Sequence, residues 1–231
     1  MISAKRIKEN INRVENDILE ACLRAGRKRE EILLLPVTKN RDPEEIRILY
    51  ESGCREFGEN RVQEMLPKIM ILPQDIKWHF IGSLQTNKVR HILDRVVLLH
   101  SLDRLSLAEE INRRALINGI KADCLIQINI SKEATKGGIY PEDTDRFLDS
   151  IGSYDNIRIR GLMTIGPAVY DRDLSRSLFM IMKSKFVDIG CKKMHNVNMI
   201  HLSMGMSGDF REAIECGADI VRIGTAIFEE Y

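Results

Sequence analysis

The sequence predicts an α/β fold: a single (β/α)8 barrel, or TIM barrel, with an extra helix at its N-terminus. Three observations lead to this prediction. Short apolar segments alternate with amphipathic segments, the alternation yields eight strands, and no linker rich in Pro, Gly or Ser divides the 231 residues. Strands that alternate with helices pair in parallel. An open, doubly wound sheet is the competing architecture, and the count of eight favours the barrel.

The first predicted element is a helix over residues 3–25. Ile7, Ile11, Val14 and Ile18 recur there at three- and four-residue spacing with charged residues between them, and Gly26 is the expected stop. No clear helix follows the last predicted strand. The leading helix is therefore expected to complete the outer ring of the barrel.

The alternation itself begins at residue 32. Residues 32–37 form a continuous apolar run, which is typical of a strand buried on both faces. Asp42 and Pro43 supply an N-cap and a first helical residue for a helix that reaches residue 53. The later strands are expected at residues 55–58, 77–82, 95–100, 122–129, 157–165, 198–203 and 219–223. The later helices are expected at residues 61–72, 85–93, 104–118, 141–151, 174–189 and 209–216.

The composition is that of an ordinary globular protein, and we expect one domain over residues 1–231. Hydrophobic residues make up 44% and charged residues 30%, which argues against disorder. The net charge of +1 gives no global field that would attract nucleic acid, and the basic residues near Lys88 and Arg90 fit a solvated helix face. No apolar run is long enough for a membrane span, and no signal peptide is visible. Five scattered cysteines support neither disulfides nor a metal site, so a cytoplasmic protein is expected.

In a barrel of this kind, functional residues lie where the strands end. Lys39 follows six largely apolar residues, and it is either a lysine that forms a Schiff base with a carbonyl or one that simply reaches solvent. Asn60 follows the second strand. Gly58 and Gly82 mark either a close backbone approach or an ordinary turn. His79 is interpreted as a buried histidine with hydrogen-bond partners, because no second histidine lies at metal-ligand spacing.

The last two strands end in residues suited to an anion. Ser203 ends the seventh strand, and Gly224 and Thr225 follow the eighth, where barrels often hold a phosphate group. The alternative is a capped turn into the next helix. Arg222 alternates with Val221 and Ile223, and if it points into the barrel its charge needs a partner. That partner is either a ring nitrogen of a cofactor or an internal carboxylate.

A lysine, a phosphate loop and a buried arginine together indicate a phosphate-bearing aldehyde held as an imine. Pyridoxal 5′-phosphate (PLP) is the common molecule of that description. The sequence therefore predicts PLP as the cofactor, without a metal ion.

Ordered sequence blocks lie at residues 37–39 (VTK), 57–64 (FGENRVQE), 78–88 (WHFIGSLQTNK), 100–104 (HSLDR), 127–131 (QINIS), 161–165 (GLMTI), 202–207 (LSMGMS) and 221–228 (VRIGTAIF). Through these blocks the chain resembles the pyridoxal phosphate homeostasis protein family over essentially its whole length. Ser83 departs from the pattern, since many relatives have Pro there. The family is in turn similar to the barrel domain of alanine racemase, known as fold-type III.

The resemblance implies a role for each predicted site residue. Lys39 would carry the Schiff base, and Arg222 would face the pyridine nitrogen. Ser203 and the backbone of Gly224 and Thr225 would hold the phosphate, while Asn60 would line the ring side of the pocket. The roles of Met204 and Ser207 stay open.

The resemblance further implies a protein that binds PLP for intracellular PLP homeostasis and has little or no catalysis of its own, so that no residue is assigned as catalytic. An arginine at the ring nitrogen disfavours its protonation, and the second domain that racemases use is expected to be absent. The alternative is a fold-type III amino-acid racemase or lyase, and a third possibility is an interaction protein with a vestigial pocket. PLP is the expected partner, with PLP-dependent apo-enzymes as candidate recipients, no nucleic acid or membrane partner, and a monomeric state.

Overall fold

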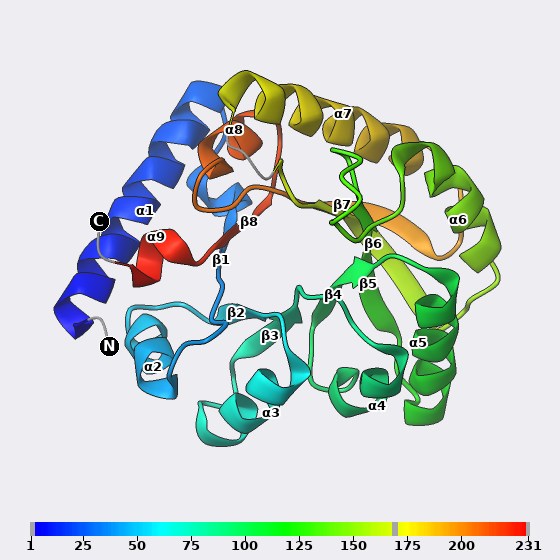
Figure 1. Ribbon diagram of the computed structural model, residues 1–231, viewed down its shortest axis with the longest axis horizontal. Coiled ribbons are helices and arrows are strands. Elements are labelled where there is room, and N and C mark those ends of the chain that lie inside the picture. The colour runs from blue at the N-terminus through cyan, green and yellow to red at the C-terminus, as the bar shows by residue number, and fades with distance from the viewer. Residues whose placement is uncertain (1–2, 168–170, 230–231) are drawn as a thin grey trace.

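Eight parallel strands form the inner ring of the computed structural model, and helices surround them (Figure 1). The structure describes residues 3–167 and 171–229. The strands are β1 (Leu33–Pro36), β2 (Glu56–Glu59), β3 (Lys77–Phe80), β4 (Leu98–Leu102), β5 (Ala122–Ile128), β6 (Ile157–Thr164), β7 (Val197–Ser203) and β8 (Ile220–Ile223). The α-helices are α1 (Ala4–Ala25), α2 (Pro43–Glu51), α3 (Val62–Ile71), α4 (Val89–Ile92), α5 (Leu105–Asn118), α6 (Thr144–Ile151), α7 (Arg172–Gly190), α8 (Phe210–Glu215) and α9 (Thr225–Phe228).

The strand order shows how the ring closes. The hydrogen-bonded order is β1-β8-β7-β6-β5-β4-β3-β2, so β1 and β2 are the two ends of the sheet. These ends meet through a parallel bridge between Val37 and Gly58, and the backbone N–H of Thr38 donates to the carbonyl of Gly58 at 2.9 Å. An open, doubly wound sheet would leave its edges apart. The predicted α/β barrel is therefore confirmed.

The element boundaries agree with the prediction except near the fourth strand and after the eighth. The fourth strand was expected at residues 95–100 and lies at Leu98–Leu102, because the N–H of Arg95 closes a turn onto the carbonyl of Ile92. After the last strand, where no clear helix was expected, the structure has the one-turn helix α9. Two predicted helices begin with 3-10 turns, η2 (Thr86–Lys88) and η3 (Pro141–Asp143).

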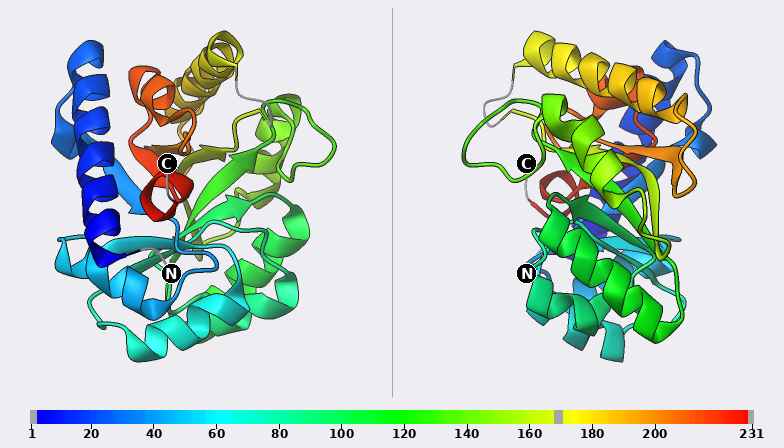
Figure 2. Two further views of the ribbon diagram at one scale, coloured as in Figure 1. Left: turned by 60° about the vertical axis from the view of Figure 1, so that its left-hand side comes forward. Right: turned by 90° about the vertical axis from the view of Figure 1, so that its right-hand side faces the viewer.

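Helix α1 covers the side of the barrel next to α8 and α9 (Figure 2). It begins after Ser3, whose hydroxyl accepts from the N–H of Arg6, and it ends at Gly26, which has φ +65°. The amide of Asn10 donates to the carbonyl of Ile227 at 3.0 Å, which ties α1 to the end of α9. The leading helix thus takes its expected place in the outer ring.

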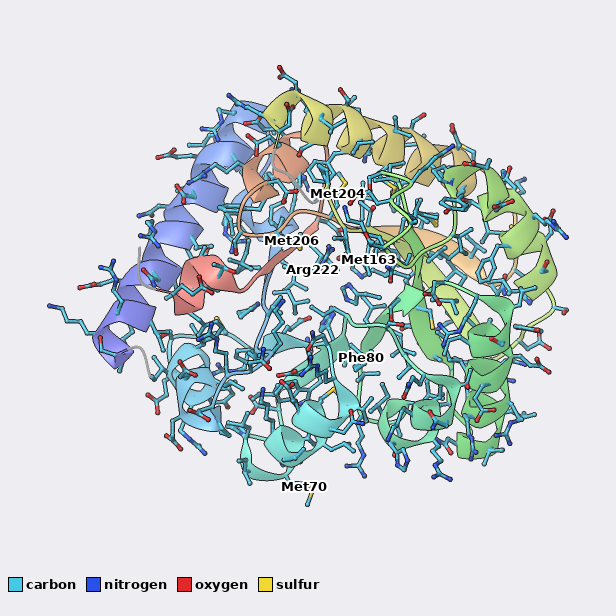
Figure 3. The ribbon with its side chains drawn as sticks, viewed as in Figure 1. Met70, Phe80, Met163, Met204, Met206 and Arg222 are labelled. Carbon is cyan, nitrogen blue, oxygen red and sulfur yellow. The ribbon has the colours of Figure 1, made fainter. Side chains whose placement is uncertain are left out.

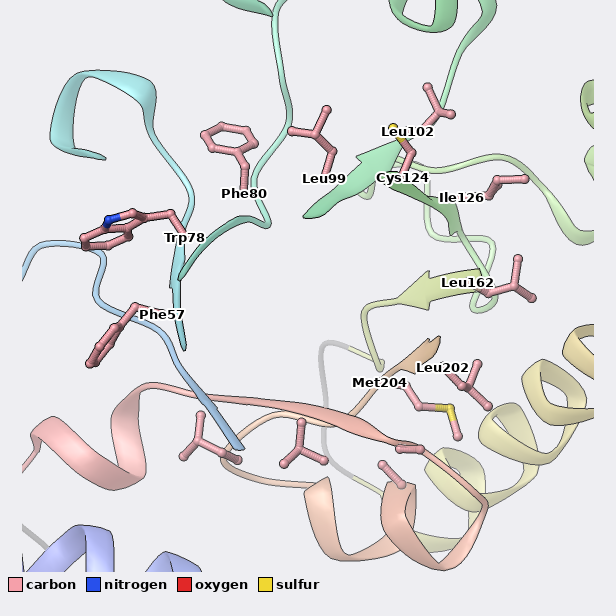
Figure 4. Close-up of a cluster of buried hydrophobic side chains, with 14 of the residues drawn as sticks. Phe57, Trp78, Phe80, Leu99, Leu102, Cys124, Ile126, Leu162, Leu202 and Met204 are labelled. Carbon is pink, nitrogen blue, oxygen red and sulfur yellow. The ribbon is translucent and has the colours of Figure 1, made fainter. Parts of the chain in front are cut away.

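Two apolar layers stabilise the barrel. Side chains such as Phe57, Trp78 and Phe80 point outward from the strands into the layer beneath the helices (Figure 4). A smaller inner cluster fills the barrel itself and consists of Leu35, Leu98, Leu125, Met163 and Ile220. Because side chains alternate along a strand, Arg222 faces the same interior as Ile220. Arg222 therefore points into the barrel, where its charge needs a partner.

None of the helices formed by the described residues combines the length and the apolar character needed to cross a bilayer.

Candidate functional site

A cavity of about 550 Å³ opens where the strands end. Five of the six predicted site residues line it: Lys39, Asn60, Arg222, Gly224 and Thr225. The remaining lining comes mainly from the loops after the strands and includes Val37, Ile81, Gly82, Ser83, Gln127, Thr135, Lys136, Gly137, Met163, Ile165, Met206, Ser207 and Gly208. Figure 3 shows Met163, Met206 and Arg222 near the centre of the helical ring, whereas Met70 lies on its outside.

Lys39 lies one residue beyond a buried polar cluster at the end of β1. The Lys68 ammonium contacts the Glu59 carboxylate at 2.6 Å and donates to the carbonyl of Thr38 at 2.8 Å. The hydroxyl of Thr38 donates to the same carboxylate at 2.6 Å. All three residues are buried, while the side chain of Lys39 is exposed to the cavity. The cluster fixes the backbone from which the Lys39 amine reaches the cavity.

Asn60 supplies a hydrogen-bond acceptor to the site. Its Oδ1 is buried and has no hydrogen-bond partner in the described part of the chain. Such an atom is costly unless a ligand donates to it. The backbone at this point is held by Gly82, because a Cβ there would collide with the carbonyl oxygen of Asn60. Gly82 therefore permits a close backbone approach, which is one of the two interpretations offered for it.

Arg222 is a buried cation with neutral contacts. Only 4% of the residue is exposed, and burial lowers the pKa of its guanidinium to about 10. Its Nη1 donates to the hydroxyl of Ser203 at 2.7 Å, and its Nη2 donates to the carbonyl of Thr164 at 2.7 Å. We find no ion pair between it and any described carboxylate. A ligand in the cavity, which Arg222 also lines, can supply the missing acceptor.

Ser203 lies beneath Arg222, outside the cavity lining. It is completely buried as the last residue of β7, and its hydroxyl contacts Arg222 and Nδ1 of His100. The expected contact of Ser203 with a phosphate does not fit this placement. Ser207, four residues further on, lines the cavity beside Gly224 and Thr225, and its hydroxyl accepts from the N–H of Ala226 at 3.1 Å. Sequence spacing did not distinguish the two serines.

Two histidines lie inside the barrel beyond Ser203, and His100 is the one that contacts the serine hydroxyl. His79 Nδ1 lies 2.9 Å from His100 Nε2, and His79 Nε2 lies 2.8 Å from the Glu56 carboxylate. The interpretation of His79 as a buried, hydrogen-bonded histidine is confirmed. Sequence analysis assigned no role to His100, whose one visible signal was a polar residue within an apolar strand. No group of three or more described His, Cys, Asp or Glu residues could hold a metal ion.

The burial of His100 predicts a pH-dependent stability. Burial is the main cause that lowers the pKa of His100 well below 6.5, and the positive charge of Arg222 acts in the same direction. As pH falls below about 6.5, His100 becomes protonated in the unfolded chain but stays neutral in the folded chain, so the folded state loses stability. We expect the unfolding free energy to fall by up to about 1.4 kcal/mol per pH unit from this residue. Denaturant titrations of wild type and His100→Asn between about pH 7.5 and 5.5 measure it. Equal slopes in both proteins would contradict the assignment.

Comparison with known protein sequences gives one consistent family. Residues 2–231 match the family described as alanine racemase, N-terminal domain. The chain is 45% identical over 223 residues to the pyridoxal phosphate homeostasis protein of Aquifex aeolicus, covering 96% of this chain and 97% of that protein. It is 37% identical over 226 residues to the pyridoxal phosphate homeostasis protein of Escherichia coli, covering 96% and 95%.

Solved structures agree with the sequence matches. PipY of Synechococcus elongatus, solved with PLP bound, aligns with a TM-score of 0.79 and 33% identity, covering 92% of this chain and 100% of that one. The alanine racemase of Streptomyces coelicolor aligns with a TM-score of 0.71 at 16% identity over 98% of this chain and 58% of that one, which shows the shared fold alone. The chain therefore belongs to the alanine racemase N-terminal domain family and, within it, to the pyridoxal phosphate homeostasis proteins.

Proposed function

We propose that this protein binds PLP in the cavity at the barrel mouth and serves in PLP homeostasis. One observation carries the proposal: the Lys39 amine and the Arg222 guanidinium, which forms no direct ion pair with a described carboxylate, line the same cavity. The Lys39 amine can form an imine with the aldehyde of PLP, and the Arg222 cation can donate a hydrogen bond to its ring nitrogen. The names of the curated relatives and the PLP-bound PipY support the same ligand.

Six residues of the cavity have a proposed part in holding PLP. Lys39 attaches the aldehyde as a Schiff base, in which the amine nitrogen replaces the aldehyde oxygen and water leaves. The hydroxyl of Ser207 and the backbone of Gly224 and Thr225 hold the phosphate, with Ser207 in the part first expected of Ser203. Arg222 donates to the pyridine nitrogen. Asn60 accepts a hydrogen bond through its Oδ1.

The site residues also favour binding over catalysis. PLP stabilises carbanions through its ring, and it does so best when the ring nitrogen is protonated. The positive charge of Arg222 disfavours that proton. We therefore propose little catalytic activity, and we expect no enzyme-like exchange of the α-hydrogen of alanine in deuterated water. Clear protein-dependent exchange would instead establish an amino-acid racemase or lyase.

Titration of the wild-type protein with PLP tests the proposal. We expect a visible absorbance band at an equimolar ratio that disappears on borohydride reduction, because reduction destroys the imine. A protein that stays colourless with excess PLP would contradict the proposed PLP binding. The cavity would then be interpreted only as an anion-binding site of the barrel. The proposal extends to a monomeric state, a cytoplasmic location and delivery of PLP to apo-enzymes. Size-exclusion chromatography tests the monomeric state. Reactivation of an apo-enzyme by the PLP-loaded protein tests the delivery.

A further inference from the structure

A chain of hydrogen bonds crosses the barrel interior from the cavity to the opposite end. It runs from Arg222 to Ser203 (2.7 Å), from Ser203 to His100 (3.1 Å), from His100 to His79 (2.9 Å) and from His79 to Glu56 (2.8 Å). Its members come from β8, β7, β4, β3 and β2. The three inner side chains are almost completely buried, with exposed fractions of 3% or less.

The far end of the chain meets solvent. Glu56 is the first residue of β2, so it lies at the strand ends opposite to the cavity. It is partly exposed and lines a second cavity of about 300 Å³ together with Lys77, His79, Val97, Leu98, Asp123, Arg160 and His201. The hydrogen bond with His79 is the main cause that lowers the pKa of Glu56. One end of the chain is therefore a carboxylate, and the other is a guanidinium.

These two ends fix the direction of every proton between them. The Glu56 carboxylate can only accept, so His79 donates from Nε2, and a neutral imidazole that donates from Nε2 accepts at Nδ1. His100 then donates from Nε2 and accepts at Nδ1, which receives the hydroxyl proton of Ser203. The Ser203 oxygen accepts from Arg222, which can only donate. One arrangement of protons satisfies the whole chain.

Reversing the donor and acceptor roles along the chain leaves two atoms without a suitable partner. A neutral His79 that donated from Nδ1 would leave Nε2 without a proton against the Glu56 carboxylate. The Ser203 hydroxyl would receive protons from both Arg222 and His100, and no other described group accepts its own proton. Unpaired buried groups of this kind cost about 1–3 kcal/mol each. The favoured direction transmits the negative charge of Glu56 toward Arg222 by polarising each bond in turn.

We propose that His79, His100 and Ser203 are positioning residues that hold Arg222 in place for the ring of bound PLP. The proposal rests on the proposed function for the ligand, while the chain itself belongs to the protein. Two of the five N–H donors of the guanidinium are engaged by Ser203 and the carbonyl of Thr164, so the plane of the group is fixed and the remaining donors face a defined direction. The polarised chain also offsets the buried charge of Arg222, which has no direct ion pair with a described carboxylate.

Histidine ring ¹⁵N NMR of the ligand-free protein tests the chain directly. We expect both His79 and His100 as the neutral form protonated at Nε2. A His100 protonated at Nδ1 would overturn the proposed direction. This readout needs no PLP, so it stands even if the wild-type protein fails to bind PLP, which would contradict the proposed function instead.

PLP binding by a matched set of variants tests the positioning role. Ser203→Ala cuts the chain next to Arg222, and we expect about tenfold weaker PLP binding with a shifted visible band. Ser203→Thr keeps the hydroxyl and is expected to recover most of the affinity. Ser175→Ala is the control, because Ser175 is also completely buried but its hydroxyl has no described partner. Unchanged affinity and an unchanged band in Ser203→Ala would overturn the proposal.

Glu56→Gln supplies a second test at the far end, should Ser203→Ala not fold. Glutamine keeps an acceptor for His79 and removes the charge, and the residue does not line the PLP cavity. We expect about threefold weaker PLP binding. Wild-type affinity in this variant would overturn the transmission of charge along the chain.

Discussion

Replacing Lys39 with alanine is expected to abolish the visible absorbance band that the wild-type protein develops with PLP. Lys39 lies beyond the end of β1, lines the cavity and supplies the amine that we assign to the Schiff base. Alanine has no nitrogen to attach the aldehyde, so covalent binding should be lost completely. Absorbance spectra before and after borohydride measure the band, and mass spectrometry of the reduced wild type locates the modified residue.

Lys136 provides the matched control for this experiment. It is a second lysine of the same cavity, and its ammonium donates to the carbonyl of Gly166 at 2.6 Å and contacts Glu133 at 2.5 Å. Because these bonds engage the amine, Lys136→Ala should keep the band. If the band instead persisted in Lys39→Ala and vanished in Lys136→Ala, the attachment would belong to Lys136.

Most of the barrel could be predicted because its signals are local. Apolar runs such as residues 32–37 identify strands, and Asp42 with Pro43 marks the start of a helix. The fourth strand was misplaced because residues 95–97 are also rich in β-branched residues, while the turn from Ile92 to Arg95 that excludes them is a backbone feature. The helix α9 was missed because a single turn gives no periodic pattern.

The candidate site divides in the same way. Lys39, Asn60, Arg222, Gly224 and Thr225 could be named from their positions at strand ends, and they line one cavity. The placement of the two serines depends on where β7 stops relative to the barrel axis, which the segment LSMGMS does not reveal. The contact between His100 and Ser203 joins residues 103 apart in the chain, and only the closed ring brings them together. Contacts between residues so far apart in the chain leave no pattern in the local sequence.

The largest loss of stability is expected from Lys68→Met. Methionine keeps most of the side-chain volume but removes the ammonium, which leaves the fully buried Glu59 carboxylate without its cation. Removing one partner of a buried ion pair costs about 3–5 kcal/mol. The carbonyl of Thr38 would also lose its donor, so the backbone next to Lys39 would loosen and PLP binding should weaken as well. Denaturant unfolding and PLP titration measure the two effects.

Two further variants distinguish the effect of the unpaired, buried Glu59 charge from other causes of destabilisation. Lys192→Met breaks an ion pair with Asp145 in which 41% and 61% of the two side chains are exposed, and it should cost no more than about 1 kcal/mol. The double variant Lys68→Met with Glu59→Gln removes both charges, so it should recover part of the stability lost by the single change. A double variant no more stable than Lys68→Met alone would show that lost packing, and not the unpaired Glu59, causes the destabilisation.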